Sequence, residues 1–139
     1  MFHETRLRVR FGETDLAGHV NNAVYLSYLE EARVDFFRSV FETEKVPLIL
    51  ASAKLDFMRQ VFFPDILRIE TGILRLGRTS FDMLHRLFRE ESGEIALIGV
   101  ATLVRFNYDR QAPEPLDVFW RDRLNRYLVE PHVSGRDPS

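Results

Sequence analysis

One change of hydrophobic period divides this chain into two unlike parts. Between residues 22 and 41, apolar side chains recur every three or four positions, which is the period of a helix with one buried face. After this segment, apolar and polar residues alternate over several stretches, which is the period of β-strands. One long helix followed by a series of strands predicts an α+β domain in which the helix packs against an antiparallel sheet.

Turn signals divide the rest of the chain. Residues 5–11 alternate ahead of the helix and predict a first strand, and further strand patterns follow at 48–57, 66–76, 80–87 and 94–108. Gly77 and the sequence ESGE at 91–94 supply hairpin turns. Pro113 and Pro115 end the last strand, residues 116–128 predict a short helix, and 131–139 predict a flexible tail. No repeat or linker interrupts the series, so we expect a single domain over residues 1–139.

Charge and composition exclude several classes of function. The formal net charge of -2 gives no broad attraction to nucleic acid, and the absence of cysteine excludes disulfides, zinc thiolates and a thiol nucleophile. No apolar run reaches the roughly 20 residues that span a bilayer, and the N-terminus lacks a signal-peptide pattern, so we expect a cytoplasmic protein. The strands carry more apolar surface than one helix covers, which predicts a homo-oligomer.

An aspartate stands one loop ahead of the predicted helix start. Asp15 lies in a polar loop, and Asn21 or Asn22 is suited to cap the helix, because an asparagine side chain accepts a hydrogen bond from a first-turn amide. The first turn of a helix also presents unpaired amides that attract an oxyanion. A carboxylate beside such amides supplies the two parts that hydrolysis by acyl transfer requires.

Other catalytic arrangements find no support in the sequence. The GxSxG motif of a serine nucleophile is absent, and the histidines lie too far apart in sequence for metal-ligand spacing, so we expect no metal site. Taken alone, an aspartate in this position is more often a loop cap in an Asx-turn than a catalytic group.

The residues around this aspartate resemble those of a known family. The stretch VRFGETDLAGHVNNAVYLSYLEEAR, residues 9–33, resembles the N-terminal signature of hotdog-fold acyl-CoA thioesterases of the 4-hydroxybenzoyl-CoA thioesterase type, and their bacterial acyl-CoA thioesterase branch most of all. The resemblance continues more loosely through residues 56–81 and 105–116. It implies a sheet wrapped around a central helix, two subunits joined edge to edge, and active sites at the dimer interface.

The resemblance also implies a reaction and a set of site residues. The reaction is hydrolysis of an acyl-CoA to free CoA and a carboxylic acid, without a cofactor, because CoA is part of the substrate. Asp15 falls on the catalytic aspartate, which acts as nucleophile or general base, and the amides of Asn22 and Ala23 fall on the oxyanion-binding helix start. The other expected binding residues are Gly18, His19, Asn21, Tyr25 and Ser80.

Charged side chains outside the motif allow further predictions. Arg59, Arg75 and Arg78 are candidates for contacting CoA phosphates, because a guanidinium matches phosphate oxygens with two hydrogen bonds. Taken alone, each is more often a solvated surface charge than a phosphate contact. Glu30 and Arg33 are one helical turn apart, which predicts an ion pair within the helix.

Two other functions remain open at this point. A hotdog dehydratase or hydratase acting on acyl thioesters needs a histidine with a carboxylate, for which His19 with Glu30 or Glu31 is a poorly placed substitute. A non-catalytic acyl-CoA binding module would share the motif without turnover. The sequence also leaves open the length and aromatic character of the acyl group, delivery by CoA or acyl carrier protein, and a dimer or a tetramer.

Overall fold

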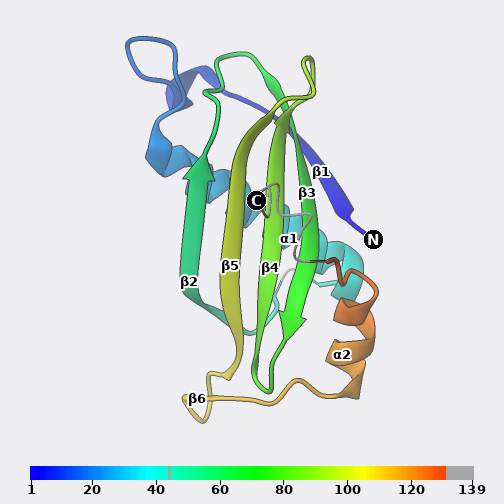
Figure 1. Ribbon diagram of the computed structural model, residues 1–139. Coiled ribbons are helices and arrows are strands. Elements are labelled where there is room, and N and C mark those ends of the chain that lie inside the picture. Colours follow the sequence, from blue (N-terminus) through cyan, green and yellow to red (C-terminus); the bar gives the residue numbers. More distant parts are fainter. Residues whose placement is uncertain (44, 131–139) are drawn as a thin grey trace.

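The computed structural model describes residues 1–43 and 45–130, which form one sheet and two α-helices (Figure 1). The N-terminal part contains β1 (His3–Arg8), the short 3-10 helix η1 (Phe11–Glu13) and the long helix α1 (Asn22–Phe41). The elements that follow are β2 (Leu48–Phe57), β3 (Ile66–Leu76), β4 (Ser80–Arg89), β5 (Ile95–Asn107), β6 (Ala112–Pro113) and α2 (Val118–Asn125).

The sheet is antiparallel throughout, in the order β1-β3-β4-β5-β2, and β6 pairs with β5. β2 and β1 are the two edges, and α1 crosses behind the strands (Figure 1). One long helix packed against an antiparallel sheet is the hotdog arrangement. The predicted α+β fold class is therefore confirmed.

One face of α1 supplies much of the core. The buried residues of this face are Tyr25, Tyr28, Leu29, Ala32, Arg33, Phe36 and Phe37. Strand residues meet them in two clusters, one including Leu67, Ile69, Leu87 and Leu97 and the other including Ile73, Phe81, Met83 and Leu103. Since burial of one large apolar side chain contributes about 1.5–3 kcal/mol, this face is sufficient to hold the helix on the sheet.

The helix begins and ends at residues suited to those positions. Asn21 is the N-cap, and its Oδ1 accepts a hydrogen bond from the Ala23 amide at 2.9 Å. Glu42 follows the last turn in the left-handed conformation, with φ of 59°, which stops the helix. The predicted range of 22–41 is therefore confirmed, and Asn21 rather than Asn22 is the cap.

The first strand is shorter than the sequence pattern predicts. β1 pairs with β3 as far as Arg8, and residues 11–13 form η1 instead of a strand. The Glu13 carboxylate accepts a hydrogen bond from the Arg10 amide at 2.8 Å, which turns the chain away from the sheet. Val9 is fully buried although it lies past the end of β1, so the apolar alternation continues after the strand has ended. The strand prediction for residues 9–11 is wrong for this reason.

The other predicted elements agree well with the structure. β2 and β3 have the predicted bounds, β4 and β5 differ from theirs by one or two residues at an end, and α2 lies within the predicted 116–128. The predicted flexible tail, 131–139, lies outside the described residues.

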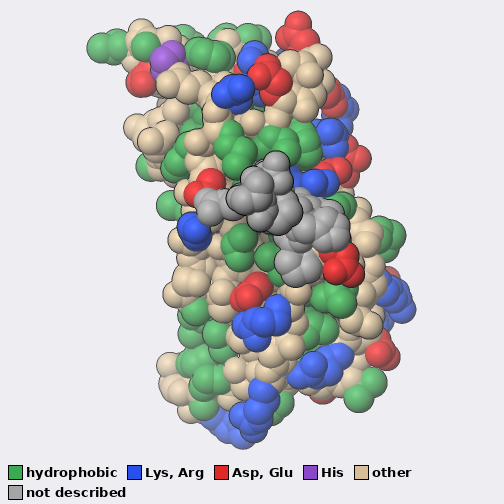
Figure 2. Space-filling view, viewed as in Figure 1, with side chains coloured by type: hydrophobic (Ala, Val, Ile, Leu, Met, Phe, Trp, Pro, Cys, Tyr) green, Lys and Arg blue, Asp and Glu red, His purple; other side chains and the backbone are tan. Residues whose placement is uncertain are grey.

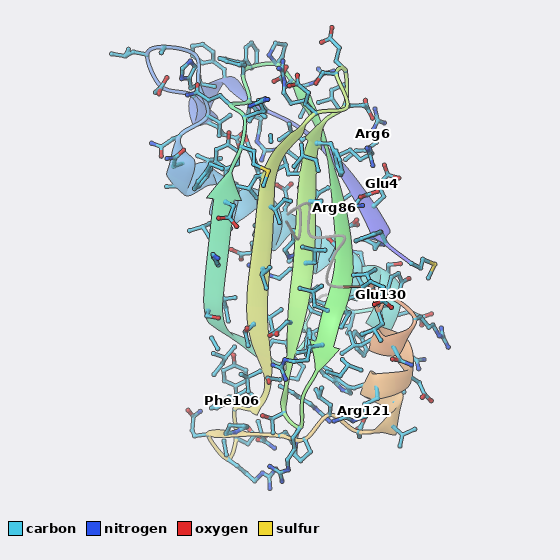
Figure 3. The ribbon with its side chains drawn as sticks, viewed as in Figure 1. Glu4, Arg6, Arg86, Phe106, Arg121 and Glu130 are labelled. Atoms are coloured by element: carbon cyan, nitrogen blue, oxygen red, sulfur yellow. The ribbon has the colours of Figure 1, made fainter. Side chains whose placement is uncertain are left out.

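The sheet face opposite α1 mixes charged and apolar side chains (Figure 2). On it, Arg86 of β4 pairs with Glu70 and lies 4.5 Å from the ring centroid of Phe2 (Figure 3). Gly72 is also covered, because a Cβ built there would come within 3.1 Å of side-chain atoms of Phe2 and Val129. Segments near the two chain ends therefore cover part of this face.

Candidate functional site

A cleft of about 810 Å³ opens where β2 ends and α1 begins. Three segments form it: the loop before α1, the first turn of α1, and the end of β2 with the residues after it. The lining residues are Asp15, His19, Val20, Asn21, Asn22, Tyr25, Phe57, Met58, Arg59 and Gln60. Most of the site residues predicted from the sequence thus lie around one cavity.

A tight turn holds Asp15 at this cleft. The Gly18 amide donates to the Asp15 carbonyl at 3.0 Å, and the Asp15 amide donates to the His19 carbonyl at 2.8 Å. Gly18 has a φ of 83°, in the left-handed region that glycine enters without steric cost. Gly18 does not line the cleft, so its effect on the site comes through the shape of the loop.

The two oxygens of the Asp15 carboxylate have different surroundings. Oδ1 accepts hydrogen bonds from the amides of Ala17 at 2.9 Å and His19 at 3.1 Å. Within residues 1–43 and 45–130, Oδ2 has no hydrogen-bond partner. The Asx-turn interpretation therefore describes one oxygen, and the other is free to meet a ligand.

The first turn of α1 leaves one amide unpaired at the cleft. The Ala23 amide donates to the side chain of Asn21, and the Val24 amide donates to the Asn21 carbonyl at 2.9 Å. The Asn22 amide has no acceptor in the described part of the chain, and Asn22 lines the cleft. Of the two amides predicted to bind an oxyanion, that of Asn22 is free and that of Ala23 is engaged.

Aromatic rings give the cleft an apolar wall. Tyr25 is 2% exposed, and its ring lies edge-on to Phe57 with 5.3 Å between centroids. The Tyr25 hydroxyl accepts a hydrogen bond from the Val61 amide at 3.3 Å, and burial raises the pKa of Tyr25. The phenol is therefore neutral, and the exposed part of Phe57 extends the apolar surface toward the opening.

Arg59 is the predicted CoA-phosphate residue that lines this cleft. Its Nε lies 3.1 Å from Oε2 of Glu94, and its side chain is 65% exposed. The guanidinium therefore keeps hydrogen-bonding groups that an anionic ligand can reach.

Ser80 lies far from the cleft within one protomer. Strand register places Ser80 opposite Val104, and Val104 in turn lies opposite Ile49 at the start of β2. The stretch from Ile49 to Phe57 spans roughly 26 Å at about 3.3 Å per residue. A single protomer does not bring Ser80 to Asp15.

Arg75 and Arg78 lie at the same distant end, around the turn between β3 and β4 (Figure 1). Arg75 is bound to the carboxylate of Asp82, with 2.9 Å between Nε and Oδ2. Arg121 donates to the Gly77 carbonyl at 2.6 Å and marks this end of the sheet in Figure 3. A ligand in the cleft of the same protomer is out of reach of both arginines.

The carboxylates required for dehydratase chemistry do not line the cleft. Glu30 is exposed, and Oε2 of Glu31 lies 3.6 Å from Nη2 of Arg10. The predicted interaction of Glu30 with Arg33 is electrostatic only: the described residues show no ion pair between them within 4 Å, but the charge of Glu30 opposes the effect of burial on the pKa of Arg33. Arg33 is 9% exposed against the sheet, where burial lowers its pKa.

Some lining residues were not predicted from the sequence. Met58 and Gln60 follow the end of β2, and no spacing or motif links them to Asp15. The link is tertiary, since the Val20 amide donates to the Val61 carbonyl at 3.1 Å and so ties the two segments together. Glu13 was also missed, although it stands inside the motif.

Two structural features are absent from residues 1–43 and 45–130. No helix in this part of the chain is long and apolar enough to cross a membrane. Nor does this part contain a group of three or more histidine, aspartate or glutamate side chains suited to a metal ion.

Comparisons with known proteins point in one direction. Residues 9–124 match the thioesterase-like superfamily. The chain is 33% identical over 127 residues to YsmA, an uncharacterized protein of Bacillus subtilis (strain 168), which covers 89% of this chain and 83% of YsmA. It is 24% identical over 130 residues to FadM, the long-chain acyl-CoA thioesterase of Escherichia coli (strain K12), which covers 90% of this chain and 98% of FadM.

A solved structure is similar over most of its length. The thioesterase of Thermus thermophilus, complexed with coenzyme A and Zn, has a TM-score of 0.77 and 33% sequence identity to this chain. The similarity covers 87% of this chain and 95% of that one.

Proposed function

The chain belongs to the thioesterase-like superfamily, and on this basis we propose that it is an acyl-CoA thioesterase, which hydrolyses a thioester to free CoA and a carboxylic acid. FadM is named for long-chain acyl-CoA, and the Thermus thermophilus enzyme was solved with coenzyme A. One observation carries the proposal: Asp15, whose Oδ2 has no partner in the described part of the chain, and Asn22, whose amide has none there either, line the same cleft.

In the proposed reaction, the thioester carbonyl lies between Asp15 and the first turn of α1. Asp15 either attacks the carbonyl carbon or takes a proton from a water molecule that attacks it, and in both cases the carbonyl oxygen becomes an oxyanion. The Asn22 amide and the positive end of the α1 dipole stabilise that charge.

Collapse of the tetrahedral intermediate breaks the C–S bond. CoA leaves as a thiolate and takes up a proton. With water as nucleophile the carboxylic acid forms in this step, whereas after direct attack water hydrolyses the mixed anhydride between the acyl group and Asp15. The reaction uses water and the protein's own groups, so we propose no cofactor and no metal.

The remaining site residues take supporting roles in this proposal. Tyr25 lies beside the acyl group together with the ring of Phe57, and Arg59 meets a phosphate of CoA at the opening of the cleft. His19 and Asn21 shape the polar wall. The backbone amide of His19 donates a hydrogen bond to the Asp15 carboxylate, and the side chain of Asn21 caps α1.

We also propose that the enzyme is a homodimer or a pair of such dimers. β2 is an edge strand with exposed apolar side chains, among them Ile49 at 37% and Phe57 at 48%. An uncovered edge of this kind is a template for pairing with another chain. Antiparallel pairing of two β2 strands sets the Ile49 end of one beside the Phe57 end of the other. The sheet end that carries the partner subunit's Ser80 then approaches this cleft, as the resemblance implies.

Release of free thiol from a panel of acyl-CoA esters tests the proposal. We expect the wild-type chain to release CoA and Asp15→Asn to retain less than about 1% of kcat, because acid–base groups commonly contribute 100-fold or more. The asparagine oxygen can still accept the amides of Ala17 and His19, so the loop shape is retained. Asp122→Asn, an exposed change on α2, is the matched control and should leave kcat unchanged.

Three results would contradict the assignment, each in a different way. Equal kcat in wild type and Asp15→Asn would remove Asp15 from the mechanism. Loss of enoyl absorbance from crotonyl-CoA without thiol release would indicate a hydratase. Binding of acyl-CoA by calorimetry with no thiol release from any ester would indicate a binding module.

A further inference from the structure

Glu13 connects the Asp15 loop to α1 at two levels of the helix. Its carbonyl oxygen accepts a hydrogen bond from the amide of the N-cap, Asn21, at 3.1 Å. Its Oε1 accepts a hydrogen bond from the hydroxyl of Tyr28 at 2.7 Å, about two turns further along the helix. Since Tyr28 is fully buried between α1 and the sheet, this second contact ties the loop to a rigid part of the core.

The same carboxylate also holds the chain that enters the loop. Oε1 accepts a hydrogen bond from the Arg10 amide at 2.8 Å, and Oε2 accepts one from Nε of Arg10 at 3.1 Å. Arg10 reaches α1 by a second and weaker route, with 3.6 Å between its Nη2 and Oε2 of Glu31. Glu13 thus joins the entry of the loop, the helix cap and the helix interior.

The electrostatics favour a charged Glu13. Burial opposes its ionisation, but hydrogen bonds from the Arg10 amide and from Tyr28, together with the Arg10 charge, lower the pKa of Glu13 on balance. Burial and the hydrogen bond to Glu13 raise the pKa of Tyr28, so its hydroxyl remains protonated and donates. At neutral pH the contact is therefore a hydrogen bond from a phenol to a carboxylate, which is among the stronger classes.

We propose that Glu13 is a positioning residue, which fixes the Asp15 carboxylate at the right distance from the first turn of α1. The inference rests on the proposed thioesterase function. Asp15 lies between Glu13 and Asn21 in the chain, so the backbone hydrogen bond between those two residues closes the loop around Asp15. The other side of the loop is held elsewhere, by the bond from Val20 to Val61. Without the Glu13 carboxylate, the loop would keep that attachment and its backbone bond to Asn21, and would lose its tie to Tyr28 in the interior of α1.

Four single variants and one double variant test this inference in the full-length chain with an acyl-CoA ester that the wild type hydrolyses. Glu13→Ala removes all side-chain contacts, and Tyr28→Phe removes one hydroxyl while the ring still fills its place. Glu13→Gln keeps acceptor capacity for Arg10 and Tyr28 but loses the charge. Glu31→Gln is the matched control, because it removes the other carboxylate near Arg10 without touching Tyr28 or the loop.

The expected signature is a loss of kcat with little change in KM. Because misplacement of a catalytic group by about 1 Å costs on the order of 100-fold, we expect Glu13→Ala to lower kcat by roughly 10- to 100-fold. Glu13→Gln should restore part of the loss, and Glu31→Gln should match the wild type. The double variant Glu13→Ala/Tyr28→Phe should be no worse than Glu13→Ala alone, because both changes remove the same contact.

Melting temperatures and circular dichroism separate positioning from folding. If Glu13→Ala and Tyr28→Phe are folded and have wild-type kcat, the inference is wrong while the thioesterase proposal stands. If Glu13→Ala fails to fold, Tyr28→Phe alone decides the question through its kcat. If the wild type itself releases no thiol from any ester, the proposed function fails and this inference fails with it.

Discussion

His85 and Thr71 form a hydrogen-bonded pair at the centre of the core, with 3.0 Å between Nδ1 and Oγ1. Both residues are fully buried, and strand register places them directly opposite each other on β4 and β3. Burial, and secondarily the charge of Arg33, lowers the pKa of His85 to about 3. Nε2 of His85 has no hydrogen-bond partner within the described residues, so the folded protein holds a neutral and incompletely satisfied imidazole.

This pair predicts a pH dependence of stability. The pKa of the same side chain in the unfolded chain is near its ordinary value of 6.5. Between pH 6.5 and 3 the unfolded chain binds a proton at His85 that the folded protein does not, so the free energy of unfolding falls as the pH is lowered through this range. Above pH 6.5 the imidazole is neutral in both states and contributes no slope.

The double variant His85→Leu/Thr71→Val isolates this contribution. It removes the titrating group and also the hydroxyl that would otherwise lose its partner. Urea unfolding at about pH 7.5, 6.5 and 5.5 should give a smaller loss of unfolding free energy for the variant than for the wild type. His3 and His19 are present in both proteins and cancel in the comparison. Parallel curves for the two proteins would show that His85 is not held neutral.

The cap of α1 allows stability and catalysis to be separated. Asn21→Ala removes the hydrogen bond to the Ala23 amide and should lower the free energy of unfolding by about 1 kcal/mol. Asn21→Asp keeps a capping oxygen but adds a negative charge next to the place where the oxyanion forms. We expect Asn21→Asp to retain wild-type stability and to lose kcat by about tenfold, which corresponds to about 1.4 kcal/mol of transition-state stabilisation.

Asp117→Ala provides the control for the cap. Asp117 is the N-cap of α2 and accepts a hydrogen bond from the Trp120 amide at 3.0 Å, away from the cleft. Its loss should cost a similar amount of stability and leave kcat unchanged. If Asn21→Asp turns over substrate as fast as the wild type, no oxyanion forms near the start of α1.

Gly18 and Gly12 form a matched pair for testing the shape of the Asp15 loop. A Cβ built at either position meets no atom within 4 Å, so both sites have room for alanine. Only Gly18 has a positive φ, of 83°, and an alanine in that region costs about 1–2 kcal/mol. Gly18→Ala should therefore lower both the melting temperature and kcat, whereas Gly12→Ala should change neither appreciably. Equal effects of the two substitutions would mean that the backbone of Gly18 does not control the position of Asp15.

Local patterns in the sequence account for the elements of this fold, and tertiary contacts account for the remainder of the site. The bounds of α1 follow from a period and a cap, which are properties of neighbouring residues. Val9 shows the limit of such patterns, because it is buried like a strand residue after the strand has ended. Met58 and Gln60 reach the cleft only because the loop and the end of β2 meet in space. The hydrogen bond that occupies the Ala23 amide likewise depends on the rotamer of the Asn21 side chain, and the spacing of residues in the sequence does not reveal a rotamer.

The edge strand β2 gives a test of the proposed dimer. Ile49 is 37% exposed on β2, whose outer edge pairs with no strand among the described residues. In a monomer, lysine at this position would be solvated and would cost little. In a dimer paired through β2, each copy would place the lysine charge at an apolar contact, which is costly unless an opposite charge lies nearby. Light scattering after size exclusion should therefore give a dimer or tetramer for the wild type and a smaller species for Ile49→Lys.

Activity should follow assembly in this variant, because the proposed cleft is completed by the partner subunit's Ser80. We expect Ile49→Lys to lose thiol release in proportion to dissociation, and to regain part of it at higher protein concentration by mass action. Val118→Lys is the control, since Val118 is 72% exposed on α2 and lies on a different part of the surface. A wild-type chain that is monomeric and fully active would rule out the shared cleft. An Ile49→Lys chain that stays assembled would instead place the interface elsewhere on the molecule.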